Sequence, residues 1–235
     1  MGYGAQNDPW GIAADATMGV TWKLQSVSND LSPSEAEAQD SNGDVCAATM
    51  YDTANQTKSA TYVACDTGTL ILHDTTDDAP DYRPGTVKSG FVITSIGLET
   101  SNSAQVKMTV AGQATSIADS DALIAKYSPA DLEIAITRKA IPVGFSVDTG
   151  NKLNSSSITL SVDVARELDS QGAECVTDVY GGRIEASGDY VGCSAAAGAS
   201  GDTGYRVTSG PSISETNTAY ETGSIGVKKS LTQMA

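Results

Sequence analysis

The four cysteines are the residues whose type and spacing could most readily do chemistry. They form two pairs, Cys46 with Cys65 and Cys175 with Cys193, and the two pairs have nearly equal spacing. A zinc site usually needs cysteines roughly two to four positions apart or several histidines, and this chain has one histidine. The pairs therefore predict either two disulfides or two pairs of small buried thiols, and the redox compartment decides between them.

No other set of residues predicts a reaction. The single histidine, His73, lies outside the cysteine segments, so a serine or cysteine nucleophile has no nameable base. An acidic loop could bind a hard cation, although a solvated loop is the simpler interpretation. Its carboxylates are Asp74, Asp77, Asp78 and Asp81. We therefore predict no catalytic residue, no metal site and no cofactor, and we expect that the protein is not an enzyme.

The cysteine pairs lie in a repeat that sets the architecture. Residues 40–65 read DSNGDVCAATMYDTANQTKSATYVAC, and residues 169–193 read DSQGAECVTDVYGGRIEASGDYVGC. Asp, Gly, Cys and Tyr recur at the same spacing, and both copies end in Tyr-x-x-Cys. The copies differ in length by one residue between the two tyrosines, where a hairpin loop tolerates change. Such a repeat indicates a duplicated architecture.

Each copy has the pattern of a β-hairpin, with two β-rich runs around a polar or glycine-containing loop. The two cysteines of a copy would then face each other across the hairpin. Tyr51 would lie diagonal to Tyr62, and Tyr180 to Tyr190, on the opposite face. Both faces are partly apolar, so we expect one to pack on a neighbouring subunit. The candidate assembly contacts are these four tyrosines and Trp10.

The elements around the repeat predict a mainly β protein. Alternating apolar residues predict a strand at residues 20–28, and a hairpin at residues 87–112 has a fainter second copy at residues 207–230. Residues 119–127 predict one short helix, and residues 31–39 predict either a helical turn or an acidic connector. The expected fold is an antiparallel β-barrel or sandwich with an internal duplication and one short helix.

Three units follow from this reading. Residues 1–18 would form an N-terminal arm, in which Trp10 either anchors on a neighbour or belongs to a frayed terminus. Residues 19–116 would form β unit one, and residues 117–235 a related unit two. Unit two either stands alone or packs with unit one as a single domain.

Charge and hydropathy exclude several classes of partner. The net charge is −15, which repels the nucleic acid backbone. No segment approaches the roughly 20 apolar residues that span a bilayer, and the first residues lack the pattern of a secretion signal. We therefore expect neither a membrane partner nor specific DNA binding.

A loose pattern over residues 20–115 resembles the tail tube proteins of tailed bacteriophages and related injection machines. It consists of a strand, D-S-x-G, a strand ending in Tyr, a hairpin, and a later segment of the VTSIGLETSNSAQVKMTVAG kind. Residues 158–230 repeat it more faintly. The resemblance implies a β-barrel or sandwich subunit that forms stacked rings, with DNA passing through an acidic lumen. It also implies a virion assembled in the host cytoplasm with other virion proteins.

Ring size and the alternatives follow from the same pattern. A duplicated fold would let three chains make a pseudo-sixfold ring, but the second copy looks incomplete in its connectors, so we favour a hexamer over a trimer. One alternative is a capsid decoration or head protein. Another is an extracellular adhesin or surface-layer module stapled by disulfides, which the missing signal pattern disfavours.

Overall fold

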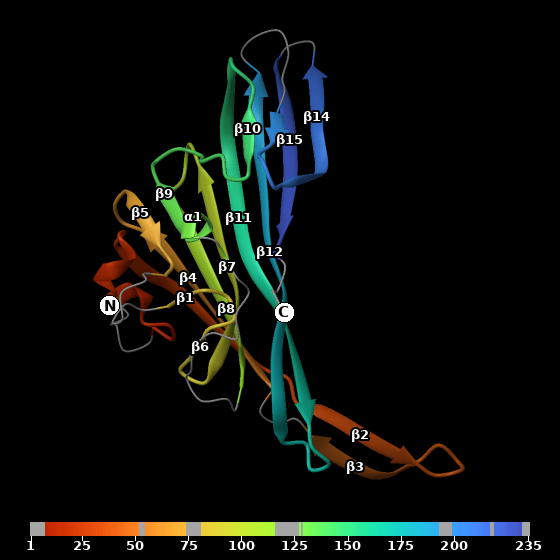
Figure 1. Cartoon of the computed structure of the whole chain (residues 1–235). Helices are drawn as coiled ribbons and strands as arrows, with labels where there is room; N and C mark the ends of the chain where they lie inside the picture. Colours follow the sequence, from red (N-terminus) through yellow and green to blue (C-terminus); the bar gives the residue numbers. More distant parts are fainter. Residues whose placement is uncertain are drawn as a thin grey trace.

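One large antiparallel sheet organises the chain (Figure 1). The computed structural model describes residues 8–51, 55–73, 81–115, 127, 129–192, 199–216 and 219–231. Nine described strands form the sheet, eight of them in the order β1-β4-β8-β7-β11-β12-β15-β14, with the short β6 (Val87–Lys88) beside β7. The predicted mainly β, antiparallel fold is confirmed.

The strand order shows the internal duplication. Module one, as we call the first four strands, consists of β1 (Trp22–Leu31), β4 (Gln56–Ala64), β8 (Lys107–Ala114) and β7 (Phe91–Ser101). Module two consists of β11 (Asn151–Leu168), β12 (Glu174–Gly192), β15 (Ala219–Ser230) and β14 (Arg206–Thr216). In each module one hairpin pairs with a second hairpin in the same order, and β7 pairs with β11 to join the modules. The boundaries of the units at residues 18 and 116 stay predictions.

Three short strand pairs complete the described structure. They are β2 (Ser34–Gln39) with β3 (Val45–Tyr51), β5 (Gly68–Ile71) with β9 (Glu133–Ile136), and β10 (Phe145–Val147) with β13 (Ala199–Gly201). The β5–β9 pair and the 3-10 turns η2 (Ile12–Ala14) and η3 (Ala16–Met18) pack over module one. The β10–β13 pair packs over module two. The β2–β3 pair projects away from the sheet (Figure 1).

The core lies between one face of the large sheet and these smaller elements. Gly112 on β8 and Gly188 on β12 make room for large rings on that face. A Cβ at Gly112 would lie 2.4 Å from the Trp10 ring, and one at Gly188 would lie 2.4 Å from the Phe145 ring. Both aromatic side chains are buried, so a single ring fills the space above each glycine.

The prediction of an exposed N-terminal arm is wrong for the residues of the arm that the structure describes. Trp10, Ile12 and Met18 are buried in the core of their own chain. Trp10 also meets Phe91 edge-on, with ring centroids 6.1 Å apart. These apolar side chains lower the free energy of the chain by leaving water, so the segment folds back on module one.

The helical segments also differ from expectation. The helix expected at residues 119–127 lies outside the described residues except for Tyr127, whose hydroxyl donates to the Ser161 carbonyl at 3.0 Å. The described α-helix is the four-residue α1 (Pro129–Leu132). Residues 31–39 form neither a helical turn nor a loose connector, because most of this segment is strand β2, which pairs with β3.

The hairpins predicted from the cysteine spacing are wrong in their pairing. Strand β3 pairs with β2, whereas β4 pairs with β1 and β8, so the polar loop between β3 and β4 does not reverse a hairpin. In module two, β12 runs unbroken through Gly181. That glycine has a φ of 64°, and the partner strand has a register shift between Ser161 and Asp163. Gly181 and Gly182 therefore lie at a bulge that bends the strand, and they do not turn the chain back.

Candidate assembly surfaces

The repeated Asp-Ser-x-Gly sequence forms the tip of the long hairpin in each module. In module one, Asp40 Oδ1 accepts hydrogen bonds from the backbone of Asn42 at 2.8 Å and of Asp44 at 3.1 Å. The Gly43 N–H donates to the Asp40 carbonyl at 3.0 Å, and the φ of 87° at Gly43 favours glycine.

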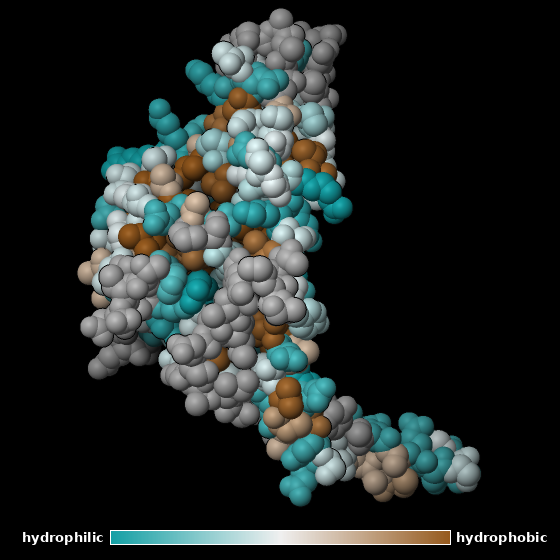
Figure 2. Space-filling view, in the orientation of Figure 1, coloured by the Kyte–Doolittle hydropathy of each residue, from teal (hydrophilic) through white to brown (hydrophobic). Residues whose placement is uncertain are grey.

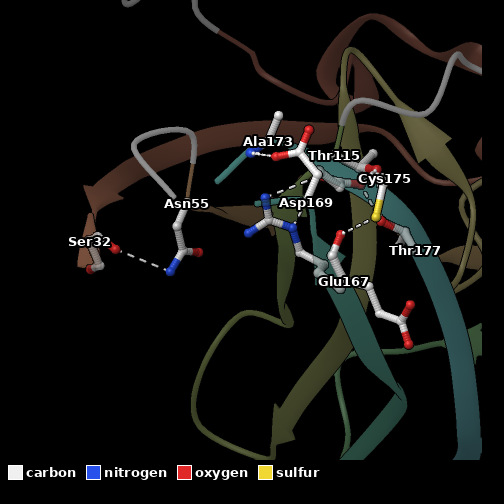
Figure 3. Close-up of polar contacts among 10 residues, drawn as sticks. Ser32, Asn55, Thr115, Glu167, Asp169, Ala173, Cys175 and Thr177 are labelled. Carbon is white, nitrogen blue, oxygen red and sulfur yellow. Dashed lines mark hydrogen bonds and ion pairs between the residues drawn. The ribbon is translucent and has the colours of Figure 1, made fainter. Parts of the chain in front are cut away.

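Module two repeats this turn bond for bond (Figure 3). Asp169 Oδ1 accepts from the backbone of Gln171 at 2.8 Å and of Ala173 at 2.9 Å, and Gly172 has a φ of 78°. Positions in the first hairpin strand and turn therefore correspond at a shift of 129, the distance from Asp40 to Asp169. The sequence repeat is real, but it marks a hairpin tip and not a hairpin between its own cysteines.

The contacts of the cysteines correspond in the two hairpins. Cys46 Sγ donates to the Ala38 carbonyl at 3.2 Å, and Cys175 Sγ donates to the Glu167 carbonyl at 3.3 Å, each across the hairpin (Figure 3). Cys46, Cys65 and Cys175 are free and exposed, and the fourth, Cys193, lies outside the described residues. For the three described cysteines, both the disulfide and the buried-thiol predictions are wrong, because their strand pairing differs from the predicted one.

The tyrosines divide between core and surface. Tyr62 is opposite Leu24, and Tyr190 is opposite Leu153, and both tyrosines are at most 1% exposed. The Tyr62 hydroxyl donates to Asp8, and burial together with this carboxylate raises the pKa of Tyr62. The predicted diagonal pairs do not form, because β3 and β4 are not neighbours in the sheet and because Tyr180 and Tyr190 lie on the same strand, β12.

Among the predicted assembly contacts, Tyr180 is the one whose described side chain is open to a neighbour, at 49% exposure. Trp10, Tyr62 and Tyr190 belong to the core. The side chain of Tyr51 lies outside the described residues. Of the acidic loop, Asp81 alone is described, and its carboxylate binds the Arg83 guanidinium; the other carboxylates of the loop lie outside the described residues.

The hairpin of module two is anchored to module one. The Glu174 carboxylate accepts hydrogen bonds from Thr115 at the end of β8 at 2.7 Å and from Arg166 Nε at 3.1 Å, as well as from Thr177. Burial raises the pKa of Glu174, but the hydrogen bonds from Thr177, Thr115 and Arg166 outweigh it and hold that pKa below its usual range. The Glu174 and Arg166 side chains are only 5% and 7% exposed.

The equivalent hairpin of module one has no such anchor. Val45 and Glu37 stand where module two has Glu174 and Arg166, and Val45 is 51% exposed. Every β2–β3 side chain that the structure describes is exposed, and Figure 2 shows this arm standing clear of the rest of the surface. Ser32 and Asn55 join the arm to β1 and β4, since Asn55 Nδ2 donates to the Ser32 carbonyl at 3.1 Å (Figure 3).

The face of the large sheet opposite the core is rich in hydroxyl groups. Strand registers place its side chains in rows across the sheet. We call three of these rows the hydroxyl face. The first row contains Ser26, Thr61, Thr109, Gly97, Thr159, Glu185, Lys228 and Arg206; the second contains Lys23, Val63, Lys107, Glu99, Ser157, Ser187, Gly226 and Ser209; the third contains Ser101, Ser155, Asp189, Ser224 and Ser212.

Hydrogen bonds within these rows hold the side chains of the hydroxyl face. Ser157 lies 2.9 Å from Ser187, Ser212 lies 2.8 Å from Ser224, and Ser155 donates to Asp189 at 2.8 Å. Sequence reasoning missed this face, although serine or threonine at every second position of several strands was the signal for it.

The two ends of the sheet leave strand edges without a partner among the described strands. Strand β1 forms one end and β14 the other. Several large apolar side chains lie exposed on these strands. They are Val27 and Leu31 on β1 and Val207 on β14.

Comparisons with known proteins give no family for the chain: neither protein-family models nor curated proteins match it. Within the described residues, no helix is long and apolar enough to cross a membrane.

Proposed function

We propose that the protein is a structural subunit that assembles with its own copies into rings, stacked as the tail tube of a bacteriophage. The observation that carries the proposal is the hydroxyl face of a continuous eight-stranded sheet. A sheet with one face in the core and one small, polar face suits the wall of a water-filled channel.

The chemistry of this face suits DNA passing without being held. The three rows contain no aromatic side chain on which a base could stack. Lys228 Nζ lies 2.9 Å from Glu185, and Lys107 is directly opposite Glu99. These two lysines are balanced by carboxylates, whereas Lys23 is opposite Val63 and Arg206 is opposite Lys228. The cations and carboxylates of the rows nearly cancel, so the face offers little net attraction to phosphate. The rows carry both signs of charge, so the face is not the acidic lumen that the resemblance implies. Weak binding of DNA to this face supports the proposal better than repulsion by an acidic lumen does.

The ring that we propose contains three chains. The sequence favours a hexamer because its second copy looks incomplete in its connectors, but both modules have the same four strands in the same order. If the resemblance to tail tube proteins holds, with six barrel units to a ring, two modules per chain make three chains sufficient. The location would be a virion, with other virion proteins at the ends of the tube.

Negative-stain imaging of the purified full-length chain tests this function. We expect hollow tubes or stacked rings, and native mass spectrometry of single rings should give the mass of three chains. Closed shells or decoration of a capsid would instead favour a head protein. Chains that remain monomeric over a wide range of concentration and salt would contradict self-assembly, and robust turnover in a hydrolase screen would contradict a structural role.

A further inference from the structure

We propose that β14 of one copy pairs antiparallel with β1 of a second copy, in the way β7 pairs with β11 inside the chain. The β2–β3 arm of the second copy would then lie against the end of β15 in the first. This inference deepens the proposed function, and it rests on its self-assembly but not on its tube.

The junction between the modules provides the template. β7 is the last strand of module one in the sheet, and β11 is the first strand of module two. β14 is likewise the last strand of module two, and β1 the first strand of module one. Among the strands that the structure describes, one β7-like edge and one β11-like edge therefore have no partner. They lie at opposite ends of the sheet, too far apart to pair within one chain (Figure 1).

A leucine shows what covering this edge does. Leu160 on β11 is opposite Ile96 of β7 and is fully buried. At the shift of 129 positions its counterpart is Leu31 on β1, which is 59% exposed. Leucine at this position of the repeat is therefore buried where a neighbouring module is present and exposed where no neighbouring module is present. A second copy is the occupant that supplies the missing module.

The contacts of the two hairpins also indicate that a second copy lies beside β14 and β15. The module two hairpin is held to module one through Glu174 and Thr115. The corresponding contact of the module one arm would be made by Val45 with Ser230, at the end of β15, in the neighbouring copy. Val45 is half exposed, so the second junction would remove an apolar side chain from water where the first joins Glu174 and Thr115 by a hydrogen bond.

The register follows from matching the modules. Tyr62 is opposite Met108, which is opposite Leu98; Tyr190 is opposite Gly223, which is opposite Ile213. Position 98 on β7 therefore matches position 213 on β14, a shift of 115 positions.

The internal pairs then map onto pairs between copies. Glu99 with Ser157 becomes Ser214 with Ser28, and Gly97 with Thr159 becomes Ser212 with Asp30. All four of these edge residues are exposed in the single chain. The pairing keeps the hydroxyl face continuous from one copy to the next. Pro211 lacks an N–H and so limits how far β14 can extend the ladder.

Disulfide cross-linking between two single-cysteine chains tests the register. In a background with the four native cysteines replaced by serine, one chain carries Ser28→Cys and the other Ser214→Cys. Opposed residues in antiparallel strands lie roughly 4.5–5.5 Å apart between Cα atoms, which a disulfide spans. We expect a covalent dimer when the two variants are mixed and oxidised, and none from either variant alone, because the contact joins two different edges.

Matched controls give the outcomes that would overturn the inference. Ser26→Cys with Ser212→Cys places the thiols on the same face but four residues out of register, and this mixture should not cross-link. Equal cross-linking of both mixtures, or cross-linking of one variant alone, contradicts the register. If the mixed variants form tubes but positions 28 and 214 do not cross-link on oxidation, the result contradicts this pairing and leaves the tube function standing. Cross-linked rings that never stack contradict the tube and leave the pairing standing.

Discussion

Leucine at one position of the repeat has two environments, and this contrast can be measured. Leu160→Ala removes a fully buried side chain at the module junction, so we expect the free energy of unfolding to fall by about 2–5 kcal/mol. Leu31→Ala removes an exposed one, so the monomer should change by less than about 0.5 kcal/mol while assembly weakens. Urea unfolding of both variants measures the difference. Equal losses in the monomer would mean that Leu31 already has a partner.

Glu174 makes stability depend on pH on the acidic side. Its pKa is lowered in the folded chain, so its contribution is present above the usual glutamate pKa of about 4.3 and is lost as the pH falls through the folded value. Glu174→Gln should cost roughly 1.5–3 kcal/mol at pH 7, and this difference should shrink below about pH 4. Unfolding curves from pH 7 to pH 3 measure it.

The matched control for this residue is Glu185→Gln. Its side chain is 49% exposed and lies beside Lys228, so we expect a cost of only about 0–1 kcal/mol. A Glu174→Gln difference that stays constant down to pH 3 would show that the charge on Glu174 does not provide the stabilisation.

At the residue scale, sequence reasoning found the right positions and gave several of them the wrong roles. The repeat singles out Asp40 and Gly43, and the structure shows that they form a tight turn. Cys46 and Cys65 were matched because their spacing is symmetric about a polar loop. Symmetric spacing cannot tell a hairpin from two strands that run on to different partners. The role of Tyr62 was wrong for the same reason. The face of the sheet on which its side chain lies depends on the strand register, and in the structure that face is the core.

The two hairpin tips share the sequence Asp-Ser-x-Gly but differ in the contacts that support their hairpins. Gly43→Ala and Gly172→Ala each force a side chain into a left-handed conformation, at a cost of roughly 1–2 kcal/mol. We expect Gly172→Ala to lower global stability, because its hairpin is anchored through Glu174. Gly43→Ala should only speed amide exchange in the β2–β3 arm.

Hydrogen exchange read by mass spectrometry, together with urea unfolding, separates these effects. Gly97→Ala is the matched control, because its Cβ would meet nothing nearer than Thr159 Oγ1 at 3.6 Å and should cost little. If Gly43→Ala lowered global stability as much as Gly172→Ala, the arm would be part of the cooperative unit.

At the element scale, the sequence predicted that strands and a duplication exist, but not which strands pair. Period-two patterns identify strands one at a time, and the partner of an edge depends on contacts far away in sequence. The junction of β7 with β11 joins two such distant segments. The alternating serines and threonines could have predicted the hydroxyl face. The β2–β3 arm could not be predicted, because the sequence of β2 is typical of a helical turn or an acidic connector.

The whole molecule carries a net charge of −15, so copies repel one another as they assemble. Raising ionic strength from about 0.01 M to about 0.15 M shortens the Debye length from roughly 30 Å to roughly 8 Å. We expect the threshold concentration for assembly to fall over this range, as measured by light scattering. Lys228→Glu would add like charge beside Glu185 and should raise the threshold at low salt, whereas Lys228→Arg should not. Assembly that weakened with added salt would point to ion pairs as its main attraction.

The unequal arms carry a consequence for anything that binds the end of a ring. Three chains would give six modules but only three copies of the β2–β3 arm, which alternate with three hairpin tips of module two. The rim would then have threefold and not sixfold symmetry. A terminator protein that recognises the arm would attach with a stoichiometry of three, and a strictly sixfold collar would find half of its positions mismatched.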